Sequence, residues 1–416
     1  MKIMINTILM FVLLASVSCE KDYTSITNPD RGGKSAKSYE KYDIIWSEAA
    51  DSCTTAFIDR FFCDEPRNGS RRGVFSYSEY NRRGGNFNCY WQQAHAMAVM
   101  VDYYNRVKAT RPDTAAILED YFTRWFDSRA NNYEGNPGYY GSTGFGNNFT
   151  DDTSWITIAL LQLFEATGEQ KYFNAAKQTW DECVRPRFEL HPYRWLPWKW
   201  TDLRANECTN GPGAIVAATL AGYAREAGDE AAFQQYLDEA YRCFDQNMDV
   251  MNPNGTLGIT PLSYTQGTCM EAGRLIWHLT GDDGYLRKAI SAARGQMSNV
   301  MNDIYEHELV MRNEGTDENN SIFHAVLLHW AARMVTDHDI DVYDSTIRKD
   351  LYNYLRRHAA IYWTIGIDKS KVAWSDSYFG TRCYQARAVG TGGSLGAFTG
   401  GAQAIESMCI IENETF

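Results

Sequence analysis

The chain has 416 residues, a formal net charge of −12 and 14% aromatic residues, including 12 Trp and 26 Tyr. The acidic balance excludes a nucleic-acid binder, because such proteins carry a basic footprint. The aromatic content exceeds what a core requires, so many rings are expected to line a surface or a cleft, where stacking on sugar faces is one use for them.

The first 19 residues are typical of a bacterial lipoprotein signal peptide. Lys2 precedes an apolar stretch, residues 8–15, that is too short to span a bilayer as a helix. The stretch ends in a Ser-Val-Ser-Cys box in which Cys19 would be lipidated, although Ser16 stands where a Leu is usual. A plain secretory peptide is the alternative. Residues 20–39 are polar and predict a flexible tether, so we expect an outer membrane lipoprotein that faces the periplasm or the cell surface.

Residues 40–416 are predicted to form one all-helical domain. Helical periodicity begins near Tyr42, Tyr90, Thr114, Thr153, Lys171, Pro212, Glu230, Gly267, Gly284, Ser321, Tyr343 and Gly400. Three short turns share a glycine, suited to a left-handed helix end, at Gly168, Gly228 and Gly281, which lie 60 and 53 residues apart. This period fits a helical hairpin with a long loop. Six such hairpins predict an (α/α)6 barrel, whereas an open superhelical solenoid needs the same local sequence.

The other connections between the predicted helices are long and carry the unusual residues. They span residues 131–150, 188–211, 251–266, 312–320 and 368–399. Functional groups concentrate on long loops that a rigid scaffold holds in place. We therefore expect a cleft on the long-loop face of the barrel.

Asp151 and Asp152 stand where one long loop meets an amphipathic helix, residues 153–164. Carboxylates at a helix start usually cap it, because exposed N–H groups and the macrodipole favour negative charge there. On the pair alone, capping is the simpler interpretation. The alternative is catalytic: neighbouring carboxylates raise one pKa and leave the other group ionised, so a nucleophile and a proton donor coexist at one pH.

Four stretches at loop-to-helix junctions resemble motifs of glycoside hydrolase family 76, the endo-α-1,6-mannanases. They are Tyr-Trp-Gln-Gln-Ala-His-Ala (90–96), Asp-Asp-Thr-Ser-Trp (151–155), Asn-Gly-Pro-Gly-Ala (210–214) and Tyr-Thr-Gln-Gly-Thr (264–268). The paired aspartates are the most specific of the four, and the resemblance runs from about Tyr90 to the C-terminus. It implies retaining, endo-acting hydrolysis of α-1,6-linked mannan or its oligosaccharides, with Asp151 as nucleophile and Asp152 as acid/base. A retaining enzyme needs these carboxyls about 5–5.5 Å apart.

The same motifs and loops supply candidate sugar contacts, each with a structural alternative. The candidates are Trp91, Gln93, His95, Trp155, Trp198, Trp200, Asn210, Tyr264, Gln266 and Asp317. For those on helices the alternative is a packed or satisfied core position. For Trp198 and Trp200 it is packing on the barrel rim, and for Asp317 it is a helix cap.

No metal or cofactor is expected. Asp337, Asp339 and Asp341 imitate the start of a calcium loop, but Val342 replaces the required Gly and Arg348 the closing Glu. We expect a monomer that binds α-mannan and touches the membrane only through its lipid. Two rivals remain: a transglycosylase on the same scaffold, and a non-catalytic glycan-binding surface lipoprotein. The latter would need rings and hydroxyl partners but no matched pair of acids.

Overall fold

The computed structural model describes residues 37–64, 73–78, 89–128, 141–314, 321–367, 382–385 and 394–416. The chain divides into two compact units, Met1–Asp43 and Ile44–Phe416. The described part of the first is a short 3-10 helix, Ser38–Lys41. The predicted signal peptide, with Cys19, and most of the predicted tether lie outside the described residues. None of the helices in the described ranges combines the length and apolar character that a membrane crossing requires.

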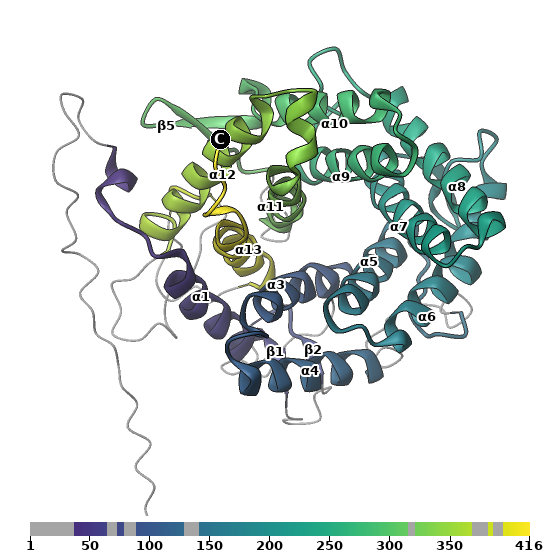
Figure 1. The fold of residues 1–416 in the computed structure, drawn as a ribbon, viewed down its shortest axis with the longest axis horizontal. Coiled ribbons are helices and arrows are strands. Elements are labelled where there is room, and N and C mark those ends of the chain that lie inside the picture. The colour runs from purple at the N-terminus through teal and green to yellow at the C-terminus, as the bar shows by residue number, and fades with distance from the viewer. Residues whose placement is uncertain are drawn as a thin grey trace, which may run out of the picture. The chain divides into compact units, whose positions relative to one another are not determined.

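Twelve α-helices of the second unit, counted over its described residues, form two concentric rings (Figure 1). The inner ring is α3 (Trp91–Val107), α5 (Thr150–Thr167), α7 (Glu207–Glu226), α9 (Ser263–Thr280), α11 (Ser321–Thr336) and α13 (Leu395–Ile411). The outer ring is α1 (Trp46–Phe61), α4 (Pro112–Asp127), α6 (Gln170–Thr179), α8 (Glu230–Asp249), α10 (Asp283–Gln296) and α12 (Ile347–Thr364). Each inner helix packs against its two ring neighbours, and α13 packs against α3. The ring is therefore closed, which confirms the (α/α)6 barrel and excludes the open solenoid.

Burial explains which helices lie inside. Helix α13 buries 15 of its 17 residues, whereas α4 buries four of its 16, in a single stripe of Ala115, Leu118, Phe122 and Trp125. A helix that is buried on nearly every face belongs in a core, and one with a narrow apolar stripe belongs at its surface. At Gly267 in α9 an added Cβ would lie 2.8 Å from the Cα of Leu327 in α11, so glycine lets these inner helices approach closely.

The two ends of the barrel differ, as the sequence predicts. At one end, short turns contain Gly168, Gly228 and Gly281 in the left-handed conformation, with φ of 73°, 73° and 72°. At the other end, long connections enter the inner helices. The connection after α6 begins with a π-helical segment, η4 (Trp180–Val184), and a 3-10 helix, η5 (Arg185–Leu190). Other 3-10 helices are η6 (Asn299–Met301), after α10, and η8 (His338–Val342), after α11 at the short-turn end.

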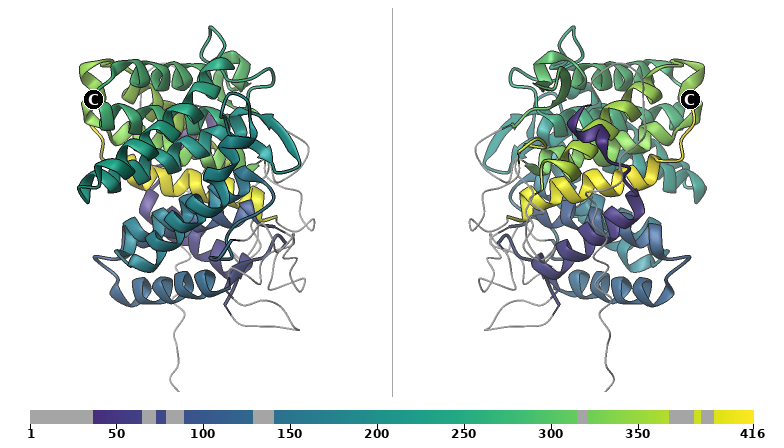
Figure 2. Two further views of the ribbon diagram at one scale, coloured as in Figure 1. Left: turned by 90° about the vertical axis from the view of Figure 1, so that its right-hand side faces the viewer. Right: turned by 90° about the vertical axis from the view of Figure 1, so that its left-hand side faces the viewer.

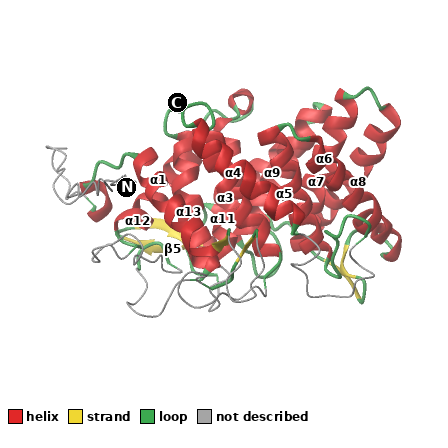
Figure 3. Cartoon of the chain, turned by 90° about the horizontal axis from the view of Figure 1, so that it is seen from below, coloured by secondary structure: helices red, strands yellow, loops and turns green. Residues whose placement is uncertain are grey.

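Where the structure describes them, the long connections also form three short antiparallel hairpins, which the sequence analysis missed. They are β1–β2 (Phe62–Cys63, Val74–Phe75), β3–β4 (Pro197–Lys199, Asp202–Ala205) and β5–β6 (Asn302–Tyr305, Glu308–Met311). Strands of two to four residues are too short to show a two-residue alternation. Figure 3 shows the strands, in yellow, on one side of the helices, and Figure 2 shows the β3–β4 hairpin projecting beyond the helix ends.

Candidate active site

A cavity of about 510 Å³ opens at the long-loop end of the barrel. The first turns of α3, α5, α7, α9 and α11 and the β3–β4 hairpin form its walls. Its lining residues are Trp91, Asp151, Asp152, Trp155, Trp198, Arg204, Ala205, Asn206, Cys208, Tyr264 and Phe323. The cavity thus brings together both predicted acids and four predicted sugar contacts, Trp91, Trp155, Trp198 and Tyr264, from four separate segments of the chain.

The two acids occupy the first turn of α5, but neither is its N-cap. Phe149 holds the N-cap position, and no side chain caps the helix there. The interpretation of the pair as helix caps is therefore wrong. Both carboxyls are instead half-buried in the cavity wall. They lie near the positive end of the α5 dipole, which favours their ionised forms.

Both oxygens of Asp151 accept hydrogen bonds from N–H groups. The main-chain N–H of Asp152 donates to Oδ1 at 2.9 Å, and the indole Nε1 of Trp198 donates to Oδ2 at 3.2 Å. Burial raises the pKa of Asp151 to about 6, and these hydrogen bonds limit the rise because they stabilise the carboxylate. Asp151 is therefore mainly ionised at neutral pH.

Asp152 is held by Asn147 in the loop before α5. The amide oxygen of Asn147 accepts the N–H of Phe149 at 3.0 Å, which fixes its orientation so that Nδ2 donates to Asp152 Oδ2 at 2.6 Å. Burial and the charge of Asp151 raise the pKa of Asp152 to about 8. At neutral pH this carboxyl therefore retains a proton, and Oδ1 is the oxygen free to carry it.

Arg187 in η5 contacts the loop that precedes the acid pair, and no sequence motif pointed to it. Its side chain is fully buried and donates to the carbonyls of Asn147 and Asn148 and to the hydroxyl of Thr150. These contacts fasten the loop that leads into α5. The positive charge of Arg187 also lowers the pKa of Asp151 and of Asp152, against the larger effect of burial.

Four aromatic rings line the cavity from four inner helices, α3, α5, α9 and α11. Tyr264 stacks on Phe323 with ring centroids 4.3 Å apart, and Trp155 and Trp91 lie 6.4 Å and 6.0 Å from these two rings respectively. Phe323 is a cavity residue that the sequence analysis missed, because a Phe on a buried helix is indistinguishable from core. Aromatic faces arranged around a cavity offer stacking surfaces for the C–H faces of sugars.

His95 lies under these rings and outside the cavity lining. Its ring meets those of Trp155 and Trp91 edge-on, with centroids 4.7 Å and 5.4 Å away. Burial lowers its pKa to about 3, so the imidazole is neutral. The structure places it as a support for the two indoles, and its predicted contact with a sugar hydroxyl remains a prediction.

Three predicted sugar contacts are amides that lie beneath the loops instead of in the cavity. Gln93, Asn210 and Gln266 are buried in the first turns of α3, α7 and α9. Each amide donates to and accepts from the main chain of the preceding long loop, with N···O distances of 2.7–2.9 Å. The partners are Phe75 for Gln93, Leu196 for Asn210, and Gly255 and Leu257 for Gln266. These side chains anchor loops to inner helices.

Of the two remaining candidates, only Trp200 lies within the described residues, and it is not among those that line the cavity. Trp200 lies against the guanidinium of Arg187, 4.9 Å from its ring centroid, which is a packing position on the rim. Asp317 lies outside the described residues. Conversely, Arg204 lines the cavity and was not predicted; it is paired with Asp202 of the same hairpin.

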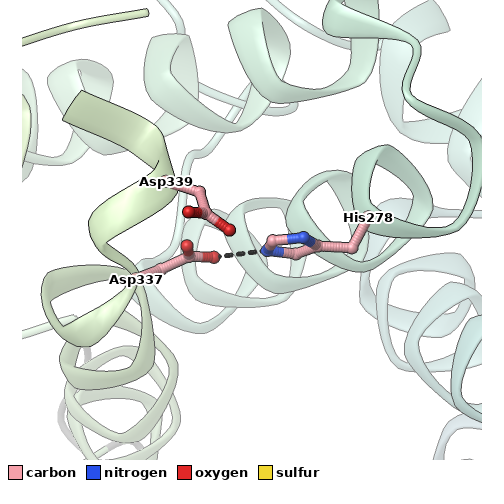
Figure 4. Close-up of side chains that lie close together, drawn as sticks. All are labelled: His278, Asp337 and Asp339. Atoms are coloured by element: carbon pink, nitrogen blue, oxygen red, sulfur yellow. Dashed lines mark hydrogen bonds and ion pairs between the residues drawn. The ribbon is translucent and has the colours of Figure 1, made fainter. Parts of the chain in front are cut away.

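A second cluster of titratable side chains lies at the short-turn end (Figure 4). His278, Asp337 and Asp339 bring potential metal-ligand atoms within 4.8 Å of one another. Asp337, however, is already shared by His278 at 2.6 Å and by the guanidinium of Arg274 at 3.0 Å. Arg274 places a positive charge where a cation would have to bind, so this cluster serves as an ion-pair link between α9 and the turn after α11.

Two carboxyls with different pKa values, in a cavity lined with aromatic rings, are the arrangement that a glycoside hydrolase uses. Comparison with known proteins agrees: residues 45–394 match the family model of Glycosyl hydrolase family 76. The chain therefore belongs to glycosyl hydrolase family 76. No curated protein sequence matches the chain significantly.

Solved structures share the fold at low sequence identity. An inactive variant of the α-1,6-mannanase of Salegentibacter sp. HEL1_6, with two adjacent aspartates replaced by alanine and α-1,6-mannotetraose bound, has a TM-score of 0.69 at 18% identity, covering 88% of this chain and 98% of that one. A family 76 mannosidase of Bacteroides thetaiotaomicron VPI-5482 has a TM-score of 0.64 at 16% identity, with coverages of 88% and 98%. Dfg5 of Chaetomium thermophilum, in complex with glucosamine, has a TM-score of 0.65 at 14% identity, with coverages of 92% and 93%.

Proposed function

We propose that the chain is a retaining, endo-acting glycoside hydrolase that cleaves α-1,6-mannosidic bonds of mannan. The carrying observation is the pair Asp151 and Asp152, which share one cavity wall and have pKa values of about 6 and about 8. The Salegentibacter enzyme supports the choice of substrate, since the variant of it that lacks two adjacent aspartates is inactive and holds an α-1,6-linked mannotetraose.

In the first step Asp151 acts as nucleophile. Its carboxylate attacks the anomeric carbon of the mannose, and the bond from that carbon to the glycosidic oxygen breaks. Asp152 gives its proton to this oxygen, so the leaving sugar departs as a neutral alcohol. The product of the step is a mannosyl ester on Asp151, and Asp152 is left ionised.

In the second step Asp152 acts as base. It takes a proton from water, whose oxygen attacks the anomeric carbon and releases the Asp151 carboxylate. Two inversions at one carbon retain the configuration. A sugar hydroxyl that replaced the water would make the enzyme a transglycosylase, and nothing among the described lining residues selects between the two acceptors.

The test is an assay of the purified protein on linear α-1,6-mannan, with branched yeast-type mannan and α-1,2-linked mannan as comparisons. We expect a mixture of short oligosaccharides from the linear polymer, with the α-anomer appearing first in proton NMR. Release of mannose alone would replace endo with exo action. Products longer than the added substrate would favour the transglycosylase. Tight binding without any cleavage would favour the non-catalytic glycan-binding protein.

We further propose that the protein is a lipoprotein anchored through Cys19 at the outer membrane. The proposal is supported by the apolar stretch that precedes Ser-Val-Ser-Cys and by the polar residues 20–39 that follow. Cys19→Ala should release the protein from the membrane fraction, because the lipid would be its only anchor. Ser18→Ala is the matched control and should remain membrane-bound. Persistent membrane association of Cys19→Ala would disprove the anchor.

A further inference from the structure

Three aromatic rings, one exposed and two half-buried, form a cluster on the loop between η5 and β3. The ring centroids of His191, Tyr193 and Trp195 lie 5.1–5.7 Å from one another. Tyr193 exposes 70% of its surface, far more than a ring normally leaves in water. None of the three lines the cavity that holds the acid pair. We call these three residues the aromatic platform.

A defined turn holds the platform together. Arg194, between Tyr193 and Trp195, has φ of 57°, a left-handed conformation that is strained for a residue with a side chain. Its N–H donates to the carbonyl of His191 at 2.8 Å, and its guanidinium pairs with Glu189. Such strain persists only where the surroundings enforce it, so the grouping of the rings is a built feature of this loop.

The platform continues directly into the wall of the cavity. Trp195 is followed by Leu196, which is buried and clamped by the Asn210 amide, and then by strand β3. Trp198 in β3 lines the cavity and donates to Asp151. Trp198 is three positions after Trp195 in the chain, so their Cα atoms are at most about 11 Å apart.

The chemistry of the platform suits a neutral sugar chain. Its rings offer apolar faces for C–H stacking, and burial lowers the pKa of His191, which favours a neutral imidazole. The flanking charges of Arg194 and Glu189 cancel within one ion pair, so no net charge there attracts an ionic ligand.

We infer that the aromatic platform binds a stretch of the α-mannan chain that extends beyond the cavity. This inference rests on the proposed function. The platform increases the affinity for polymer and takes no part in bond cleavage, because it lies outside the cavity that holds Asp151 and Asp152. A short substrate that fills only the cavity does not reach it.

The test compares a long and a short substrate in Tyr193→Ala/Trp195→Ala. We expect kcat/KM on linear α-1,6-mannan to fall at least about 5-fold, while turnover of an aryl α-mannoside is unchanged. Retention of the Asp151→Asn protein on a mannan affinity gel should fall in parallel when the platform change is added. Tyr193→Phe/Trp195→Phe keeps the rings and should restore both values.

Tyr343→Ala is the matched control, since Tyr343 is an exposed ring, 42% accessible, near η8 at the short-turn end. This variant should leave both kcat/KM on linear α-1,6-mannan and turnover of the aryl α-mannoside unchanged. Tyr193→Ala alone provides a variant whose folding is not in question, because its side chain is mostly in water. If the wild-type and platform variants had equal kcat/KM on polymer and equal retention on the mannan gel, the aromatic platform would not bind mannan. The proposed function would be unaffected. A wild-type enzyme that neither cleaves nor binds α-mannan would refute the proposed function, and the platform with it.

Discussion

Asp151→Asn is expected to abolish turnover on every α-mannoside, with a loss of at least about 10⁴-fold. The amide cannot form the mannosyl ester, so substrates with good leaving groups should fare no better than mannan. The measurement is kcat on linear α-1,6-mannan and on an aryl α-mannoside.

Asp152→Asn should lower the activity on mannan much more than the activity on the aryl mannoside. On mannan the leaving sugar must be protonated, so kcat should fall roughly 10²–10⁴-fold. On an aryl mannoside, whose leaving group departs without a proton, the first step should be nearly unaffected. The alkaline limb of the pH profile should also disappear. If Asp151→Asn instead retained activity on the aryl mannoside, the protein would still be an enzyme, but Asp152 would be the nucleophile and Asp151 the acid/base.

Both variants should remain folded, and this is the control for the two kinetic results. Burial raises the pKa of each carboxyl above its unfolded value, so at neutral pH, where both groups ionise readily in the unfolded chain, the pair costs folding stability. An uncharged amide of nearly the same shape removes that cost. We therefore expect a melting temperature at pH 7 that is equal to or above that of the wild type. Full mannanase activity in both variants would show that the pair is not catalytic.

The pH profile provides the second large effect. Activity requires Asp151 ionised and Asp152 protonated, so kcat/KM should be bell-shaped with limbs near pH 6 and pH 8. Below the acid limb the nucleophile carries a proton, and above the alkaline limb the proton donor has lost its own. Arg187→Met removes a positive charge that lowers both pKa values, so both limbs should move to higher pH, and activity at pH 6 should fall several-fold.

Arg185→Met is the matched control for this shift. It removes the same charge two residues earlier, where the guanidinium pairs with Glu239 and Asp181 instead of facing the acids. Both limbs of its pH profile should stay at their wild-type positions. Arg187→Lys should keep the limbs closer to their wild-type positions, even if the loop before α5 loosens. Limbs that do not move in Arg187→Met would show that the guanidinium serves only to hold that loop.

The architecture could be predicted because the barrel repeats its local signals. Turns at Gly168, Gly228 and Gly281 mark the hairpins, and their spacing implies the number of units. Ring closure was not predictable in the same way, since it depends on contact between α3 and α13, nearly 300 residues apart in the chain. The short hairpins were missed because their strands are stabilised by neighbouring loops and helices and carry too few residues to form a pattern.

For the site, residue type alone could not separate a ligand contact from a structural one. Asp151 and Asp152 were found through the resemblance of residues 151–155 to a family motif, since on the pair alone helix capping was the simpler interpretation. Gln93, Asn210 and Gln266 looked like sugar contacts, since an amide offers a donor and an acceptor, and the loop main chain uses that same pair of groups. Arg187 and Phe323 carried no signal, because a buried cation beneath a loop and a ring on an inner helix become recognisable only once the chain is folded.

The three amides also bear on how this scaffold tolerates change. Gln93, Asn210 and Gln266 each hold a loop through main-chain atoms, so the hydrogen bonds do not depend on which side chains the loop carries. During evolution the sequence or the length of one loop can therefore change while its attachment is kept, as long as the loop residue that bonds to the amide keeps its backbone geometry. The same kind of attachment, an amide side chain on an inner helix bonded to loop main chain, thus serves three different loops. Specificity can drift one loop at a time while the acids on α5 stay in register.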